Sequence, residues 1–153
     1  LKAAHDRGAS LRVLLDQNQD AFGHGKNGVP NRQVAFELHQ AGIDVRWCNT
    51  SGEQCHNKLL MLRDSNAQAR LLLGSANLTR RNIDNYNLET SMLVTGPANE
   101  PAMATATELM DRLWQNGPGS TPVFTLPYPA NADDSRFRYW QYRLMEATGF
   151  STF

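Results

Sequence analysis

Four side chains suited to phosphodiester chemistry stand next to two apolar runs of the sequence. His56 and Lys58 precede one run, and Ser75 and Asn77 follow the other, with one residue between the members of each pair. Because side chains alternate along a strand, each pair is predicted to project to one side of its strand. An imidazole beside an ammonium, a hydroxyl and a carboxamide suits attack on a phosphodiester, since donors must stabilise the phosphate oxygens.

The order of these segments resembles one half-site of the phospholipase D superfamily. The resemblance extends from Leu11 to Thr95 and is carried by four segments in order: His56-Asn57-Lys58, Gly74-Ser75-Ala76-Asn77, Arg80-Arg81-Asn82 and Glu89. It implies an α/β fold, with a mixed, largely parallel sheet flanked by helices on both faces. It also points to the C-terminal half of a bacterial phospholipase D-like or cardiolipin synthase-like protein.

The resemblance implies a role for each side chain. His56 would attack phosphorus as the nucleophile, and Glu89 would accept the proton on the other ring nitrogen. Lys58, Ser75 and Asn77 would bind the non-bridging phosphate oxygens. Each residue also has a simpler interpretation: a core histidine, a solvent-facing glutamate, a lysine that reaches solvent, and two turn residues.

The sequence departs from the family pattern at one acid. The family usually has an aspartate five residues after the lysine, where this chain has Arg63, and the acid follows at Asp64. The interval to the next motif is also longer, and Ser65-Asn66-Ala67-Gln68 predicts a hairpin insertion. We therefore expect Asp64 to have a supporting, structural role, either near the site or within the hairpin, and no catalytic one.

One H-x-K motif cannot complete the superfamily mechanism, which places a nucleophile and an acid on opposite sides of phosphorus. The sequence therefore predicts a partner, either a homodimer mate or the missing N-terminal half of a longer chain. The segment from Leu1 to Gly8 is typical of the end of a helix, which favours the longer chain. No cofactor is expected, and a zinc site from His56, Glu89 and a cysteine fits no structural zinc spacing.

The composition narrows the choice of substrate. The 153 residues carry 15 basic and 15 acidic side chains, so the chain lacks the broad positive field of non-specific DNA-binding proteins. This argues against nucleic acid as the substrate, although a net charge of zero is compatible with a local basic patch at Arg80-Arg81. No apolar run reaches membrane-spanning length. The compartment stays open, with membrane-associated and periplasmic bacterial locations both compatible.

The two cysteines have no metal-site spacing. For Cys48 and Cys55 we expect two free, half-buried thiols, with a disulfide across the short intervening segment as the alternative.

The hydrophobic pattern predicts a phospholipase D-like domain over residues 1–115. A proline-rich wrapping segment and a last helix, over 116–153, are expected to belong to the same domain. Strand, helix and strand over 11–15, 31–41 and 43–47 form a βαβ unit. Further elements are expected as strands at 55–62, 69–75 and 87–95, a helix from Pro101, and a helix from Asp134 or Ser135 to Thr148.

Two other segments have a functional and a plain interpretation. The glycines from Gly23 to Gly28 could let backbone amides cradle a phosphate, but a simple connection is expected. The helix from Arg136 mixes aromatic and basic residues, as helices on lipid interfaces do. Phe137, Trp140 and Leu144 also form a packing stripe, and we expect packing there.

The leading hypothesis is an enzyme that hydrolyses phospholipid phosphodiesters or transfers phosphatidyl groups through a covalent phosphohistidine. Peripheral contact with a membrane would be compatible with it. The alternatives are a nuclease of the same superfamily and a non-catalytic half that binds phosphate or a partner.

Overall fold

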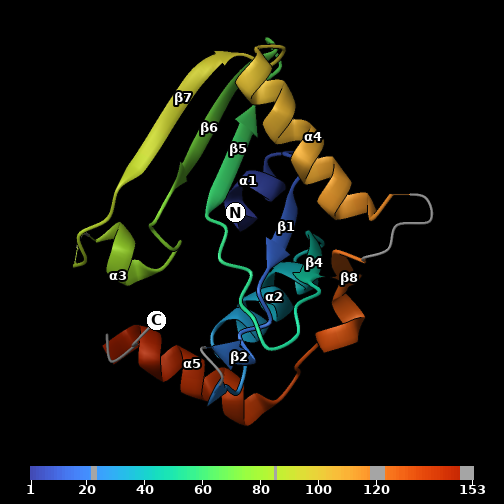
Figure 1. The fold of residues 1–153 in the computed structure, drawn as a ribbon. Coiled ribbons are helices and arrows are strands. Elements are labelled where there is room, and N and C mark those ends of the chain that lie inside the picture. Colours follow the sequence, from blue (N-terminus) through green and yellow to red (C-terminus); the bar gives the residue numbers. More distant parts are fainter. Residues whose placement is uncertain (22–23, 85, 118–122, 149–153) are drawn as a thin grey trace. The chain divides into compact units, whose positions relative to one another are not determined.

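The computed structural model describes residues 1–21, 24–84, 86–117 and 123–148 (Figure 1). Its described residues fall into two compact units, one containing residues 1–56 and 114–148, the other residues 57–113.

The first unit is built around two parallel strands joined by a helix. Strand β1 (Arg12–Leu15), helix α2 (Asn31–Gln40) and strand β4 (Asp44–Cys48) follow one another, and β1 pairs with β4 in parallel. Strand β8 (Thr125–Pro127) pairs antiparallel with β4, which gives the order β1-β4-β8. The smaller elements are α1 (Lys2–Asp6), the antiparallel pair β2 (Asp20–Ala21) and β3 (His24–Gly25), the 3-10 helix η1 (Tyr128–Asn131) and α5 (Arg136–Thr148).

The core of this unit forms where α2 packs on the sheet. Trp47 is fully buried, and its indole Nε1 donates a hydrogen bond of 2.8 Å to the carbonyl oxygen of Tyr128. Ala35 and Leu38 come from one stripe of α2, three residues apart, and meet Val45 of the sheet. The amphipathic pattern of the sequence thus accounts for the packing of this βαβ unit.

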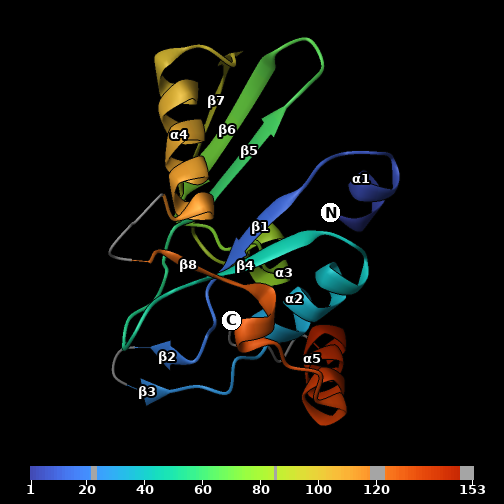
Figure 2. The same cartoon turned by 90° about the vertical axis from the view of Figure 1, so that its right-hand side faces the viewer.

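The second unit is an antiparallel sheet covered on one face by a helix (Figure 2). Strands β5 (Leu59–Arg63), β6 (Gln68–Gly74) and β7 (Ser91–Pro97) lie in that order. Helix α4 (Pro101–Gln115) follows, and the four-residue helix α3 (Arg80–Ile83) lies between β6 and β7. Alternate residues of β6, Ala69 and Leu71, are buried in one cluster with Met103 and Ala106 of α4, as period-two and helical spacing require.

The predicted α/β class with mixed strand pairing is confirmed. Parallel pairing has a smaller share than expected, because β1 and β4 run parallel and the other described strand pairs are antiparallel. Two strands also begin later than predicted. β5 starts at Leu59, so His56 and Lys58 precede it, and β7 starts at Ser91, so Glu89 precedes that strand.

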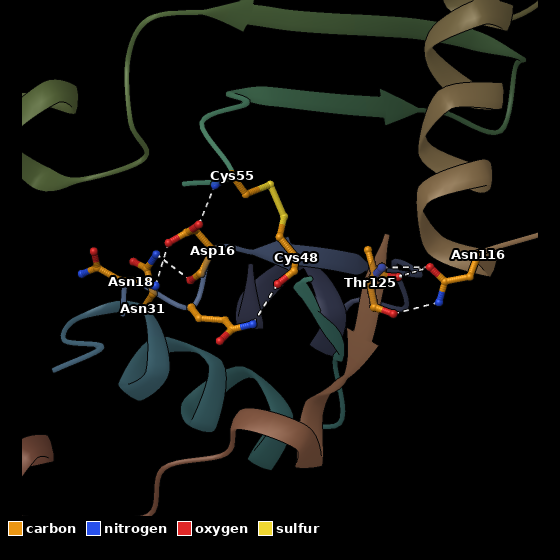
Figure 3. The surroundings of a disulfide bond; sticks show 8 residues. Asp16, Asn18, Asn31, Cys48, Cys55, Asn116 and Thr125 are labelled. Atoms are coloured by element: carbon orange, nitrogen blue, oxygen red, sulfur yellow. Dashed lines mark hydrogen bonds between the residues drawn. A yellow bond between two sulfur atoms is a disulfide. The ribbon is translucent and has the colours of Figure 1, made fainter. Parts of the chain in front are cut away.

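The expectation of two free thiols was wrong, because Cys48 and Cys55 are joined in a disulfide (Figure 3). The amide of Cys55 also donates to Asp16 Oδ2 at 2.6 Å, and Gln17 Nε2 donates to the carbonyl of Cys48 at 3.0 Å. The end of β4 and the residue before His56 are therefore tied to each other and to the segment that follows β1.

Residues 131–133 are held by side chains of α2, which lies about 100 positions earlier in the sequence. Arg32 donates to the carbonyls of Asn131 and Ala132, at 3.0 Å each. Asp133 is buried and accepts hydrogen bonds from Gln33 Nε2 at 3.1 Å and from Arg138 at 2.8 Å. These contacts fix the start of α5. Within the described ranges, no helix is long and apolar enough to cross a membrane.

Candidate functional site

Backbone hydrogen bonds continue past the ends of β5, β6 and β7 and bring the motif segments together. The amide of Gly74 donates to the carbonyl of Lys58 at 3.3 Å, and the amide of Ser75 donates to the carbonyl of Thr90 at 2.9 Å. Lys58, Ser75 and the residue after Glu89 therefore lie at the same end of one sheet, where its strands begin or stop. Backbone hydrogen bonds alone produce this alignment.

Ser75 and Glu89, both predicted from the sequence, are directly bonded. The Ser75 hydroxyl donates to Glu89 Oε2 at 2.5 Å and accepts a hydrogen bond of 3.0 Å from the amide of Thr90. The serine hydroxyl is thus held between the Thr90 amide and the Glu89 carboxylate, with the Thr90 carbonyl oxygen at 3.4 Å as a second, longer acceptor. Both side chains are exposed, so this end of the sheet is open to a solute.

Asn82 completes the group. The residue pattern assigns it no role beyond its place in the Arg80-Arg81-Asn82 segment. Its Nδ2 donates to Glu89 Oε1 at 2.5 Å. Its Oδ1 accepts from the hydroxyl of Thr79 at 3.1 Å and from Nδ2 of Asn87 at 3.4 Å, which directs the amide nitrogen to the glutamate. Only the fold of the loop around α3 could reveal this contact.

The glycine that opens the Gly-Ser-Ala-Asn segment has a steric reason. A Cβ on Gly74 would lie 2.3 Å from the carbonyl oxygen of Thr90 and 2.7 Å from the Cα of Ser91. Both are backbone atoms, one from the first residue of β7 and one from the residue before it, so they cannot move aside without breaking the pairing with β6. Gly74 thereby permits the close approach that sets Ser75 opposite Glu89.

The remaining predicted residues occupy different positions. Lys58 is half-buried just before β5, and Asn77 is exposed in the loop between β6 and α3. His56 is exposed and directly follows the disulfide-bonded Cys55. The division between the two compact units falls immediately after His56, so the histidine and the lysine of the motif are counted in different units.

Asp64 lies at the far end of the hairpin from the motif residues. Its Oδ1 accepts from the amides of Asn66 and Gln68, at 2.9 and 3.0 Å, and so fixes the turn between β5 and β6. Lys58 precedes the first residue of β5, whereas Asp64 follows the last, a separation of about 20 Å along an extended strand. A hairpin turn is present where it was predicted, and the described contacts of Asp64 stabilise that turn.

Two described amides of the glycine-rich loop donate to backbone carbonyls. Those of Lys26 and Gly28 donate to the carbonyls of Gln19 and Asn18, at 2.5 and 3.0 Å. Donors used in this way do not cradle an anion, which favours the plain connection. Gly23 lies outside the described residues.

The candidate site orients the Glu89 carboxylate by hydrogen bonds from neighbouring side chains. The described residues Ser75 and Asn82 each donate to a different oxygen of Glu89, and a carboxylate oxygen that accepts one such bond keeps further acceptor capacity. In the part of the chain that the structure describes, no three His, Cys, Asp or Glu side chains gather in a way that could hold a metal ion.

A family model described as "Cardiolipin synthase, PLD-like domain" matches residues 1–114. No curated protein and no solved structure matches the chain. The matched region contains His56, Lys58, the Gly-Ser-Ala-Asn segment and Glu89, together with the end of the sheet that aligns the last three of these. The chain therefore belongs to the phospholipase D superfamily, as a member of the family of cardiolipin synthase-type, PLD-like domains.

Proposed function

We propose that this chain supplies one of two half-sites of a phosphodiesterase or phosphatidyltransferase that acts on phospholipids. The observation that carries the proposal is the fixed Ser75–Glu89 pair, aligned with Lys58 by strand pairing inside the matched domain. Members of this superfamily that carry a single motif generally act together with a second half or a dimer mate.

In the first step, a ring nitrogen of His56 attacks phosphorus. A phosphorus–nitrogen bond forms, and the bond to the leaving alcohol oxygen breaks. The acid of the second half-site protonates that oxygen. Lys58 and Asn77 bind the non-bridging oxygens, whose charge increases in the transition state. The single hydroxyl proton of Ser75 is donated to Glu89, so Ser75 orients that carboxylate.

Glu89 accepts a hydrogen bond from the N–H of the other ring nitrogen of His56 and so stabilises the imidazolium form. Ser75 and Asn82 hold the carboxylate and leave lone pairs on both oxygens for this purpose. In the second step, water or an alcohol attacks the phosphohistidine and loses its proton to the base of the second half-site. The phosphorus–nitrogen bond breaks and His56 is restored.

Phospholipid is preferred over nucleic acid because of charge. The chain has no net charge, whereas non-specific binding to the phosphodiester backbone of a nucleic acid requires a concentration of basic residues. A phospholipid presents a single phosphodiester, which a few donors at the end of one sheet can bind.

The test is turnover of a chromogenic phosphodiester and release of head group from phospholipid. The chain is assayed alone and as part of the enzyme in which it meets its second half-site, with His56→Ala and His24→Ala compared. His24 is an exposed residue of β3 and serves as the matched control. Loss of turnover in His56→Ala alone supports the proposal. Turnover that survives His56→Ala indicates a non-catalytic half, and salt-sensitive cleavage of DNA without head-group release indicates a nuclease.

A further inference from the structure

Helix α5 has an inner face that packs against α2. The hydroxyl of Tyr139 donates to Glu37 Oε1 at 2.9 Å, and its ring meets Phe36 edge to face with centroids 6.5 Å apart. Tyr142, three residues on, is only 9% exposed. Two tyrosines one helical turn apart therefore account for the attachment of α5 to the first unit.

The opposite face carries large apolar side chains that the described residues leave exposed. Phe137 is 80% exposed, Trp140 is 70% exposed and Leu144 is 64% exposed. The expectation that these three residues pack in the core was wrong, since the tyrosine face makes the packing contacts. The spacing i, i+3, i+7 places them in one stripe along the helix.

Positive charge flanks this stripe on one side. At about 100° per residue, Arg136 and Arg143 fall on the same edge of the stripe. Both side chains are exposed, and the guanidinium of Arg143 lies 3.8 Å from Glu37 Oε1 with 53% of its side chain accessible. Arg138, by contrast, is on the inner side and bonded to Asp133.

We propose that α5 lies on an anionic phospholipid surface, with Phe137, Trp140 and Leu144 at the boundary of head groups and acyl chains. Charge complementarity selects this occupant, because the basic edge of the stripe matches head-group phosphates. Exposed tryptophan and phenylalanine beside arginine are typical of helices that lie in the membrane interface. This inference extends the proposed function, but it stands on separate residues and is measured without turnover.

The experiment is flotation of the folded protein with vesicles of phosphatidylcholine, and of phosphatidylcholine mixed with phosphatidylglycerol. We expect binding to the anionic vesicles only, together with a blue shift of tryptophan emission that Trp140→Phe removes. Leu144→Ser should lower the bound fraction, while Leu109→Ser, which changes an exposed leucine of α4, should leave it unchanged. Arg136→Gln should weaken binding about fivefold.

Three results would overturn the inference. They are failure of the folded chain to bind anionic vesicles, equal loss of binding in the Leu144 and Leu109 variants, and a dimer in sedimentation that Leu144→Ser dissociates. The last result would identify the stripe as an interface between copies of this chain. His56→Ala should bind vesicles normally, so failure of vesicle binding and failure of the proposed chemistry remain distinguishable.

Discussion

The hydroxyl of Ser75 lies 2.5 Å from Oε2 of Glu89, which joins two motif segments that are separated by fourteen positions in the sequence. The intervening chain contains α3, from which Asn82 binds the other oxygen of the same carboxylate. The acid is thus oriented from both sides, and the predictions about activity follow from this arrangement.

Replacement of Ser75 by alanine should lower kcat/KM of the assembled enzyme by about two orders of magnitude. The change removes the hydroxyl that orients Glu89 and so releases one oxygen of its carboxylate. Since Ser75 is exposed, the melting temperature should change little. Steady-state kinetics and thermal unfolding of the same preparation check this. If the melting temperature of the variant falls substantially together with kcat/KM, Ser75 has only a structural role.

Replacement of Asn82 by alanine should lower kcat more than it raises KM, because Asn82 acts on Glu89 and not on substrate. The exposed Asn66, whose amide and not its side chain binds Asp64, offers the matched substitution in the β5–β6 turn. Asn66→Ala should leave both constants unchanged. A rise in KM alone in the Asn82 variant would instead place its amide in contact with substrate.

Replacement of Gly74 by alanine should lower the free energy of unfolding by about 2 kcal/mol or more, since the new Cβ meets the backbone of β7. Gly25→Ala is the control, because a Cβ on Gly25 has no heavy atom within 4 Å. Urea unfolding of both variants gives the comparison. Equal stability of the two would contradict the close approach described here.

Asp133 should make stability dependent on acid. Burial raises the pKa of its carboxyl group, but the hydrogen bonds from Arg138 and the amide of Ser135, with the charge of Arg32, lower the pKa below its usual value. A carboxyl with a depressed pKa contributes stability that is present above the unfolded pKa and is lost as pH falls through the folded pKa.

The free energy of unfolding should therefore fall as pH drops below about 4, and Asp133→Asn should reduce this dependence. At neutral pH the substitution should lower the free energy of unfolding by about 2 kcal/mol, because the charged donors that bind Asp133 lose their charged partner. Asp134→Asn changes an exposed neighbour and serves as the control. If the two variants show the same dependence of stability on pH, the hydrogen bonds of Asp133 are not the cause of the acid sensitivity.

Loss of the disulfide should destabilise the first unit by about 2.5 kcal/mol, through the entropy of the loop that it closes. The double variant Cys48→Ala/Cys55→Ala should show this loss and also reduced turnover, since His56 follows Cys55. A thiol reductant should lower the wild-type melting temperature but leave that of the double variant unchanged. A reductant effect of equal size on both would show that it does not act through this bond.

Local pattern predicted the elements of the fold better than their ends. The βαβ unit and the three later strands were expected, because apolar periodicity is a local property. The start of β5 depends on its pairing with β6, where Leu59 meets Leu73, and no local signal marks that register. The state of Cys48 and Cys55 likewise depends on how β4 and the following loop fold, which spacing cannot decide.

The candidate site shows the same contrast. The motif residues could be found by type and order, whereas Asn82 needed the loop that turns it toward Glu89. The exposure of Trp140 could not be predicted either, since the tyrosine face and the stripe of α5 have similar apolar content and only packing on α2 distinguishes them.

The bond between Cys48 and Cys55 also determines what a protease would release. Residues 49–54 are exposed or half-buried and lie between the two bonded cysteines. A cut at any peptide bond among them leaves two polypeptides that are still covalently connected, with His56 attached to β4 through sulfur. Such a nicked protein would migrate as one species on a non-reducing gel and as two fragments after reduction.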